Sequence, residues 1–445
     1  MKIYAPWEKT FQKVSTPLEH FIHAQTTTGI ILVFMTIVAL ILANSPLHTL
    51  YENIFHLTIS LNVGSWKISQ TIHHWINDGL MALFFFLIGL EIKRNILVGE
   101  LSNIKVALLP ILAALGGMIA PALIYIAINH GLETQKGWGI PMATDIAFAI
   151  SALVLLGKRV SPSLVTFLIA LAIVDDLGAV VVIALFYTEE IHFLPLMLAG
   201  GSFLIMVAFN RFGIHAILPY FIVGMFLWFF MLESGVHATI AGVIAAMAIP
   251  SKPKHTPDDF TTHMKNKLDE YDNYPVATDF SLNEQQKALL INMSQHIDTT
   301  QSPSARLEQA LHLPVSLLVI PLFALANAGI SIDFTQIDKA IVEPISLGII
   351  AGLLFGKVIG IAGVAYVAIK MGIAQLPHNA TFSQIFGVSL LGGIGFTMSI
   401  FVAELAFYGD AASIFQAKIG ILCASLLAGI CGFIWLRFVA KQNVQ

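Results

Sequence analysis

The sequence predicts an all-α polytopic membrane protein with about twelve transmembrane helices. Of its 445 residues 57% are hydrophobic and only 11% are charged, whereas charged residues average about 25% in soluble domains. Many of its apolar stretches approach or exceed the roughly 20 residues that cross a bilayer as a helix. This composition excludes a soluble globular protein, and the net charge of −4 gives no sign of nucleic-acid binding.

The expected spans form two membrane-embedded regions, 24–250 and 313–438, which a polar interval separates. We expect transmembrane helices at 28–45, 75–92, 104–128, 142–157, 164–187, 194–210, 214–232 and 235–250, and after the interval at 313–330, 343–369, 383–408 and 414–437. Cys423 and Cys431 both lie in the last span, where we expect them to pack and not to form a disulfide or a metal site.

Three segments are expected to lie outside the membrane, on its cytoplasmic side. Residues 1–23 mix lysines and a glutamate with aromatic residues, which predicts an amphipathic surface helix and not a cleavable signal peptide. In the hydrophilic interval 251–312, the part 252–279 is rich in Pro, Lys and Asp and is expected to be loosely ordered, whereas 302–308 has the pattern of a helix start. Residues 439–445 form a short tail.

Basic residues determine the expected orientation. Twelve Lys and Arg residues fall in the short segments on one side of the predicted spans and only four on the other, apart from the long polar interval. Cytoplasmic segments carry the excess of basic residues in membrane proteins, and long loops contribute little to this rule. Both termini are therefore predicted to be cytoplasmic.

A β-hairpin is predicted at 55–69, between the first two spans and on the outer side. Apolar and polar side chains alternate over 57–61, and the alternation resumes at 66–68 after the turn sequence Asn-Val-Gly. A lone two-stranded hairpin is only marginally stable in water. We therefore expect it either to pair with a second copy of the protein or to rest on its own membrane domain, and the pattern does not choose between these.

Two adjacent carboxylates, Asp175 and Asp176, lie in the middle of the predicted span Leu164–Tyr187. An ionised Asp at the centre of a membrane helix costs about 2.5–3.5 kcal/mol on insertion scales. Such residues usually face a bundle interior or an aqueous cavity and mark an ion or proton pathway. The alternative is a structural pair that hydrogen-bonds neighbouring helices, but two acids side by side favour the pathway.

Asp145 and Lys357 add two more charges in the middle of predicted spans. Unpaired, four such charges would cost on the order of 10–14 kcal/mol, so we expect the three acids and the one base to meet. A Lys–Asp pair would lower this cost, and its charges would be sensitive to protonation because a buried Lys readily shifts its pKa down. Asp78 and Glu91 flank the second span, and Glu91, close to two basic residues, is equally well explained by an ion pair at the cytoplasmic end.

Two predicted spans contain residues that interrupt helices. They are Gly139-Ile140-Pro141, around the start of the fourth span, and the three glycines within 392–395 in the eleventh. These are the middle members of two three-helix runs that enter the membrane from opposite sides, which predicts inverted repeats and a transporter's binding site at the breaks. Because half-helix ends carry partial charges, we expect Asp145 to balance helix N-termini and Lys357 to balance C-termini.

Six motifs follow one another along the chain: ATDIAFA (Ala143–Ala149), LAIVDDLGA (Leu171–Ala179), SGVHATIAGV (Ser234–Val243), PLFALANAG (Pro321–Gly329), GLLFGK (Gly352–Lys357) and GIGFTMSIF (Gly393–Phe401). In this order they resemble the NhaA family of bacterial Na⁺/H⁺ antiporters. The resemblance extends over residues 25–438, and six separate motifs in sequence make it highly specific.

The resemblance implies a fold and a set of functional residues. It implies twelve spans with two crossed discontinuous helices, a homodimer joined through the outer hairpin, and a multi-pass location in the bacterial inner membrane. Asp175 and Asp176 match the carboxylates that bind the cation, Na⁺, and the protons, and Lys357 matches a lysine that pairs with the first of them. Thr144 and Asp145 match residues of a broken helix beside the site. The positions linked to structure, cytoplasmic access or pH response are matched by Asp78, Glu91, His237 and Glu308.

The resemblance also implies an activity: electrogenic, pH-regulated export of Na⁺ or Li⁺ in exchange for protons by alternating access, in support of sodium and pH homeostasis. The implied ligands are these ions and membrane lipid, with no cofactor and no nucleic acid. Two residues depart from the best-known members, since Asn95 replaces an acid and Ala305 replaces a base, and 254–300 resembles an insertion. All three departures are cytoplasmic, so the family's pH set-point does not carry over.

Other functions are also compatible with part of the pattern. Paired intramembrane Asp residues do not fix the cation, so an exchanger of potassium or another cation for protons is a second transporter hypothesis. An intramembrane aspartyl protease also uses two membrane carboxylates, but its Tyr-Asp and Gly-x-Gly-Asp motifs do not occur in the predicted spans. A receptor or a purely structural role leaves four intramembrane charges unexplained. No phosphate-binding loop, nucleophile elbow or His/Cys metal spacing supports an enzyme.

Overall fold

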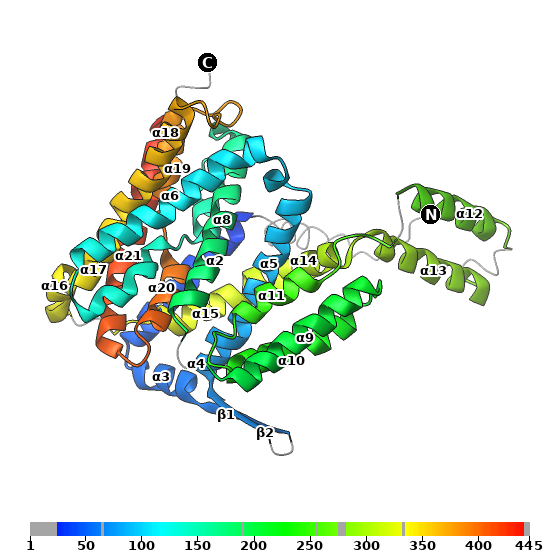
Figure 1. Ribbon diagram of the computed structural model, residues 1–445, viewed down its shortest axis with the longest axis horizontal. Helices are drawn as coiled ribbons and strands as arrows, with labels where there is room; N and C mark the ends of the chain where they lie inside the picture. The colour runs from blue at the N-terminus through cyan, green and yellow to red at the C-terminus, as the bar shows by residue number, and fades with distance from the viewer. Residues whose placement is uncertain are drawn as a thin grey trace, which may run out of the picture. The chain divides into compact units, whose positions relative to one another are not determined.

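The computed structural model describes residues 25–63, 66–188, 191–254, 257–274, 282–331 and 334–439. Nearly all of their regular structure is helical, and a two-stranded sheet is the one sheet among them (Figure 1). The amphipathic helix predicted for 1–23 lies outside the described residues, as does the predicted tail beyond Val439. The prediction of an all-helical protein with a small hairpin is confirmed.

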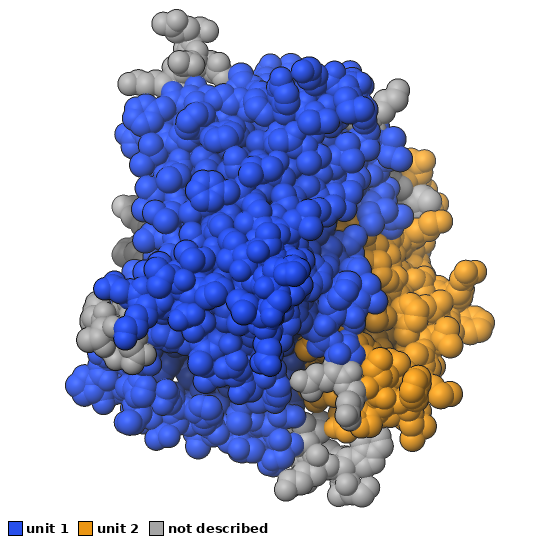
Figure 2. All heavy atoms as spheres, turned by 60° about the vertical axis from the view of Figure 1, so that its left-hand side comes forward, with its two compact units in different colours: residues 1–84, 95–189, 313–445 blue, residues 85–94, 190–312 orange. Residues whose placement is uncertain are grey.

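The chain divides into two compact units, which Figure 2 shows in different colours: unit 1 comprises 1–84, 95–189 and 313–445, and unit 2 comprises 85–94 and 190–312. The described α-helices that lie wholly in unit 1 are α2 (Gln25–Ala43), α3 (His48–His56), α4 (Ile72–His74), α6 (Ile104–Ile128), α7 (Ile146–Val154), α8 (Pro162–Phe186), α15 (Ile320–Asn327), α16 (Phe334–Val342), α17 (Pro344–Ala351), α18 (Val364–Lys370), α19 (Phe382–Leu391), α20 (Phe396–Ala406) and α21 (Ala411–Val439). Unit 2 holds α9 (Phe193–Arg211), α10 (Ile217–Glu233), α11 (Ile240–Ala248), α12 (Pro257–Asp272), α13 (Glu284–Thr300) and most of α14 (Pro303–Pro314), while α5 (Met81–Leu97) contributes residues to both units.

Seven helices in the described residues are long and apolar enough to cross a membrane, and two bent helix pairs raise this number to nine. Nine of the twelve predicted spans coincide with these candidates. The other three, 75–92, 214–232 and 235–250, fall on the shorter helices α5, α10 and α11. The polytopic helical architecture is therefore confirmed, and the full number of twelve spans stays a prediction.

The hairpin predicted at 55–69 is present as β1 (Thr58–Val63) and β2 (Trp66–Thr71). The two strands pair antiparallel, and the hydroxyl groups of the paired residues Ser60 and Ser69 lie 2.8 Å apart. In the described part of the chain each strand pairs only with the other. Both therefore present an open edge, the feature through which strands of separate chains associate.

The stretch Pro344–Lys370 forms one long helix that packs along α6. Its middle consists of two π-helical segments, η6 (Gly352–Gly356) and η7 (Val358–Gly363), with Lys357 between them. π-Helical turns are rare and occur frequently at functional sites. The local backbone thus distinguishes Lys357 from the residues of an ordinary helix.

Two glycines allow this long helix to touch the backbone of α6. A Cβ atom added to Gly360 would lie 2.1 Å from the carbonyl oxygen of Gly116, and one added to Gly116 would lie 2.3 Å from the carbonyl oxygen of Gly360. Main-chain atoms cannot move aside as a flexible side chain does, so the close approach requires glycine on both sides. This contact sets the distance between α6 and the helix that carries Lys357.

Both spans predicted to be interrupted are broken. In the eleventh, α19 and α20 are bent by 48° across 392–395, where the sequence has its three glycines. In the fourth, the 3-10 helix η3 (Glu133–Met142) ends at Met142, and α7 begins at Ile146. The break therefore lies at 143–145, just after the predicted position 139–141, because the tighter 3-10 winding continues through Pro141.

The polar interval contains more helix than the sequence predicted. Residues 252–279 were expected to be loosely ordered, and this was wrong for 257–272, which form α12. On α12 the side chains of Lys267 and Glu270 form an ion pair of 2.8 Å, and the rings of His263 and His296 stack at 3.8 Å between α12 and α13. Contacts between the two helices, which composition does not reveal, stabilise them.

We predict that Gly360→Ala lowers the free energy of unfolding by about 1–3 kcal/mol, because the new methyl group overlaps the backbone of α6. Gly363→Ala is the matched control, since no described heavy atom lies within 4 Å of a Cβ at that position in the same helical segment. The melting temperature of the detergent-purified protein should fall only for the first variant. Equal melting temperatures would contradict the close contact.

Candidate functional site

α8 carries both predicted site acids in the middle of an uninterrupted helix. Asp175 and Asp176 are each only 2% exposed. Successive residues of an α-helix point about 100° apart, so the two carboxylates face different directions. They lie at the same level of α8 but on different sides of it.

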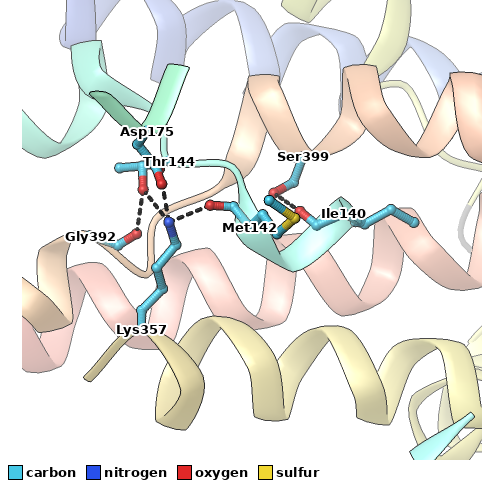
Figure 3. A network of polar contacts seen from close by, with 7 residues as sticks. All are labelled: Ile140, Met142, Thr144, Asp175, Lys357, Gly392 and Ser399. Atoms are coloured by element: carbon cyan, nitrogen blue, oxygen red, sulfur yellow. Dashed lines mark hydrogen bonds and ion pairs between the residues drawn. The ribbon is translucent and has the colours of Figure 1, made fainter. Parts of the chain in front are cut away.

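Lys357 is completely buried, and its side chain reaches from the π-helical stretch to the break in the fourth span (Figure 3). Its Nζ donates to Oδ2 of Asp175 and to Oγ1 of Thr144, at 2.8 Å each, and to the carbonyl oxygen of Met142. An ammonium group has three N–H donors, and these three acceptors use all of them. The contacts fit the charged form of Lys357, and the expected Lys–Asp contact is present.

Thr144 connects Lys357 to the second break. Its hydroxyl accepts from the Nζ of Lys357 and donates to the carbonyl oxygen of Gly392, at the end of α19, at 2.9 Å. A hydroxyl group has one donor and two acceptor positions, so both contacts are made at once. This buried side chain therefore links the two broken spans and the ammonium group.

Asp145 caps two half-helices at the same time. As the N-cap of α7, it accepts a hydrogen bond at Oδ1 from the N–H of Phe148, at 3.1 Å. At the start of α20, Oδ2 accepts from the N–H of Thr397, at 3.1 Å, and from the hydroxyl of the same residue. Free N–H groups and the positive ends of two helix dipoles thus converge on one buried carboxylate.

Two further hydrogen bonds join the breaks. The main-chain N–H of Asp145 donates to the carbonyl oxygen of Ile394 at 2.6 Å. The hydroxyl of Ser399, on α20, donates to the carbonyl oxygen of Ile140, on η3, at 2.8 Å, and Figure 3 shows this contact beside those of Lys357. The two breaks are therefore held against each other by hydrogen bonds next to the buried ammonium.

Two tyrosines hold η3, the half-helix that leads into the first break. The hydroxyl of Tyr187, at the end of α8, donates to the carbonyl oxygen of Lys136 and accepts from the N–H of Gly139, at 3.0 Å each. The hydroxyl of Tyr125, on α6, donates to the carbonyl oxygen of Thr134 at 2.9 Å. These contacts fix η3 to α8 and α6.

The site offers oxygen atoms and a charge balance that suit a small hard cation. Oδ1 of Asp175 is buried and has no hydrogen-bond partner among the described residues, a costly arrangement unless a proton or a cation binds there. With Lys357 charged and both Asp175 and Asp176 ionised, these three side chains together carry a net charge of minus one. Within the described ranges no three His, Cys, Asp or Glu side chains form a metal-ligand set, so a bound cation would also need hydroxyl or main-chain oxygens.

The other predicted residues lie elsewhere along the chain. Asp78 is part of a π-helical turn, η1 (Trp75–Leu80), in unit 1. Glu91, His237 and Glu308 belong to unit 2. There Nε of Arg94 donates to both carboxylate oxygens of Glu308, at 2.9 and 3.1 Å. A role of these four predicted residues in access or pH response stays a prediction.

Three hydroxyl groups around the start of α20 were missed in the sequence: those of Thr397 and Ser399, on α20, and that of Ser425, on α21. Thr397 and Ser399 make the contacts to the other broken span described above, and Oγ of Ser425 accepts from the N–H of Phe396 at 3.1 Å. For Thr397 and Ser399 the available signal was their position shortly after three glycines, because a helix that starts inside the membrane needs partners for its first N–H groups.

The model of the family Na⁺/H⁺ antiporter 1 matches residues 19–436. The chain belongs to this family. It is 70% identical over 442 residues to the Na⁺/H⁺ antiporter NhaA of Sulfurimonas denitrificans, covering 99% of this chain and 100% of that protein. It is 48% identical to Na⁺/H⁺ antiporter NhaA 1 of Saccharophagus degradans and 49% identical to NhaA of Dichelobacter nodosus, each time over 98% of this chain and 94% of the relative.

Membership of the NhaA family makes the chain a multi-pass membrane transporter and not an enzyme. The resemblance inferred from the six motifs is confirmed, and the protease hypothesis is excluded. Of the motif residues, Thr144 and Asp175 bind the ammonium group of Lys357, and Asp145 follows Thr144 in the same break.

We predict that Lys357→Met destabilises the protein by about 3–5 kcal/mol, because removal of one partner leaves an uncompensated buried charge on Asp175. The melting temperature of the detergent-purified protein measures this effect. The double variant K357M/D175N should recover part of the loss, since it removes both charges. Lys339→Met, at an exposed position of α16, is the control and should melt like the wild type. An unchanged melting temperature in K357M would contradict the ion pair.

Proposed function

We propose that the chain is a secondary transporter that exchanges Na⁺ or Li⁺ for protons. Family membership supports this, because relatives named Na⁺/H⁺ antiporters match the chain over at least 94% of their length. The observation that carries the proposal is the buried Lys357–Asp175 ion pair, with Asp176 next to it, at the contact of two broken spans. Charges at such positions mark routes for ions and protons.

In the proposed cycle, Asp175 and Asp176 bind either the cation or protons. In the proton-loaded state Asp176 is protonated, and the Lys357 ammonium is bonded to Asp175. A cation bound to the two carboxylates supplies the positive charge that Asp175 otherwise receives from the ammonium. Lys357 and Asp176 then each release a proton. Two protons thus exchange for one monovalent cation, and one net charge crosses the membrane per cycle.

The site is proposed to open alternately to the two sides of the membrane. Cation and protons compete for the same groups, so the site changes its accessible side with either the cation or protons bound. No separate coupling device is needed. The two breaks support this, because each lies in the middle helix of a predicted three-helix run, at 104–187 and 343–437. The twelve spans and the inverted repeats are part of this proposal.

We place the protein in the bacterial inner membrane with both termini cytoplasmic, as the distribution of Lys and Arg indicates. We further propose a homodimer that forms through the hairpin at 55–69. The open edges of β1 and β2 support it, because a hairpin of a second copy can extend the sheet by main-chain hydrogen bonds.

Asp78, Glu91, His237 and Glu308 are proposed to serve cytoplasmic access, structure or pH response. The hydrogen bonds between Arg94 and both oxygens of Glu308 support this for Glu308, since protonation of the carboxylate would end the ion pair. Because Asn95 and Ala305 replace charged residues of well-known family members, we propose a pH set-point specific to this chain.

We predict that Asp176→Asn abolishes exchange, because an amide neither takes up a proton nor offers a charge to the cation, although its similar size preserves folding. Proteoliposomes with an imposed pH gradient should lose the gradient after pulses of Na⁺ or Li⁺ with the wild type but not with D176N. Asp338→Asn, at an exposed position of α16, is the control and should behave like the wild type. Full activity of D176N would refute the site, and loss of the gradient after K⁺ would favour the second transporter hypothesis.

We also predict that exchange responds to membrane voltage. An imposed potassium-diffusion potential, set with valinomycin, should change the rate of Na⁺-driven proton movement in the same vesicles, because the proposed cycle moves one net charge. A rate that is independent of the imposed voltage would contradict the exchange of two protons for one cation, even if exchange itself is observed.

A further inference from the structure

Thr397 holds Asp145 from the opposite broken span. It is the second residue of α20 and is only 5% exposed. Its main-chain N–H and its hydroxyl both donate to Oδ2 of Asp145. Any residue except proline would keep the first contact, but a valine or alanine side chain cannot make the second, whereas serine can. The side chain of Thr397 therefore contributes a specific contact to this carboxylate.

Asp145 belongs to the segment that binds Lys357. Met142 and Thr144, at the same break, supply two of the three acceptors of the Lys357 ammonium. These residues lie outside any helix or at its end, so helical hydrogen bonds do not fix them. Their position therefore depends on contacts with the other broken span. Asp145 is the only charged residue of the segment 142–145, and the hydrogen bonds from Thr397 to its carboxylate are among these contacts.

We propose that Thr397 is a positioning residue of the cation site. Its hydroxyl holds Asp145 at the start of α20 and so keeps Met142 and Thr144 where they bind Lys357. The residue acts through Asp145 and needs no contact with the transported ion. Preorganised groups bind an ion without a further ordering cost, so loss of the hydroxyl weakens cation binding. This inference rests on the proposed Na⁺/H⁺ exchange.

Ser399 is the matched control. It lies two residues further along α20, is completely buried, and also donates its hydroxyl to the other broken span. Its acceptor is the main-chain carbonyl oxygen of Ile140 in η3 and not a carboxylate. Loss of either hydroxyl removes one hydrogen bond between the same two spans, but only the loss at Thr397 removes a hydrogen bond from the Asp145 carboxylate.

The test compares Thr397→Val, Thr397→Ser and Ser399→Ala in proteoliposomes. We expect T397V to raise the apparent KM for Na⁺ about tenfold, equivalent to about 1.4 kcal/mol and consistent with a hydrogen bond to a charged group, with Vmax changed less than twofold. T397S should keep the wild-type KM because it keeps the hydroxyl. S399A should lower the melting temperature as T397V does but raise the KM less than twofold, because no hydrogen bond to Asp145 is lost. If T397V does not insert, T397A replaces it in the comparison with T397S.

Two results would overturn the proposal: a wild-type KM in the variant without the hydroxyl, or equal KM changes in T397V and S399A. A double-mutant cycle, in which the melting temperatures of T397V, K357M and the double variant are compared, tests the positioning role without a transport assay. We expect the decreases in melting temperature caused by T397V and by K357M to be non-additive. Additive effects would refute the link from Thr397 to Lys357. Absence of Na⁺-driven exchange in the wild type would instead refute the proposed function, and the melting cycle would still decide the role of Thr397.

Discussion

The buried ammonium of Lys357 is the constraint on which the rest of the site depends. A charge without solvent is tolerated only with a counter-charge and with hydrogen bonds to its remaining donors. Here the acceptors come from α8 and from the break after η3. The π-helical stretch around Lys357, the glycine contact with α6 and the interruption of the fourth span all serve to bring one nitrogen to these oxygens.

The two breaks impose a second constraint, because main-chain groups without partners are costly inside a membrane. The structure satisfies them by pairing one break with the other. The N–H of Asp145 meets the carbonyl of Ile394, the hydroxyl of Thr144 meets the carbonyl of Gly392, and the Asp145 carboxylate meets the N–H of Thr397 at the start of α20. Each interrupted span thus supplies the hydrogen-bonding groups that the other lacks, which explains why two breaks occur and why they lie together.

The sequence predicts the charged residues of this site better than the groups that hold them. Asp145, Asp175 and Lys357 stand out because a charge in an apolar span has few structural explanations. Thr397 does not stand out, because hydroxyl groups are common in membrane helices and often bond within their own helix. The first break lies after Pro141 and not at it, since contacts with the other span decide where the helix stops. The helix at 257–272 was missed because packing against α13 stabilises it.

In the exchange that we propose, the hydrogen bonds of Lys357 link cation binding to proton binding. Of its three acceptors only Asp175 carries a charge, whereas Met142 and Thr144 offer neutral oxygens. If a proton or a cation neutralises Asp175, the ammonium keeps two hydrogen bonds but loses its counter-charge. A buried charge without a counter-charge is strongly disfavoured, so occupation of the carboxylate favours release of the lysine proton. In the exchange that we propose, binding at the carboxylate is therefore coupled to protonation of Lys357 by electrostatics within a single site.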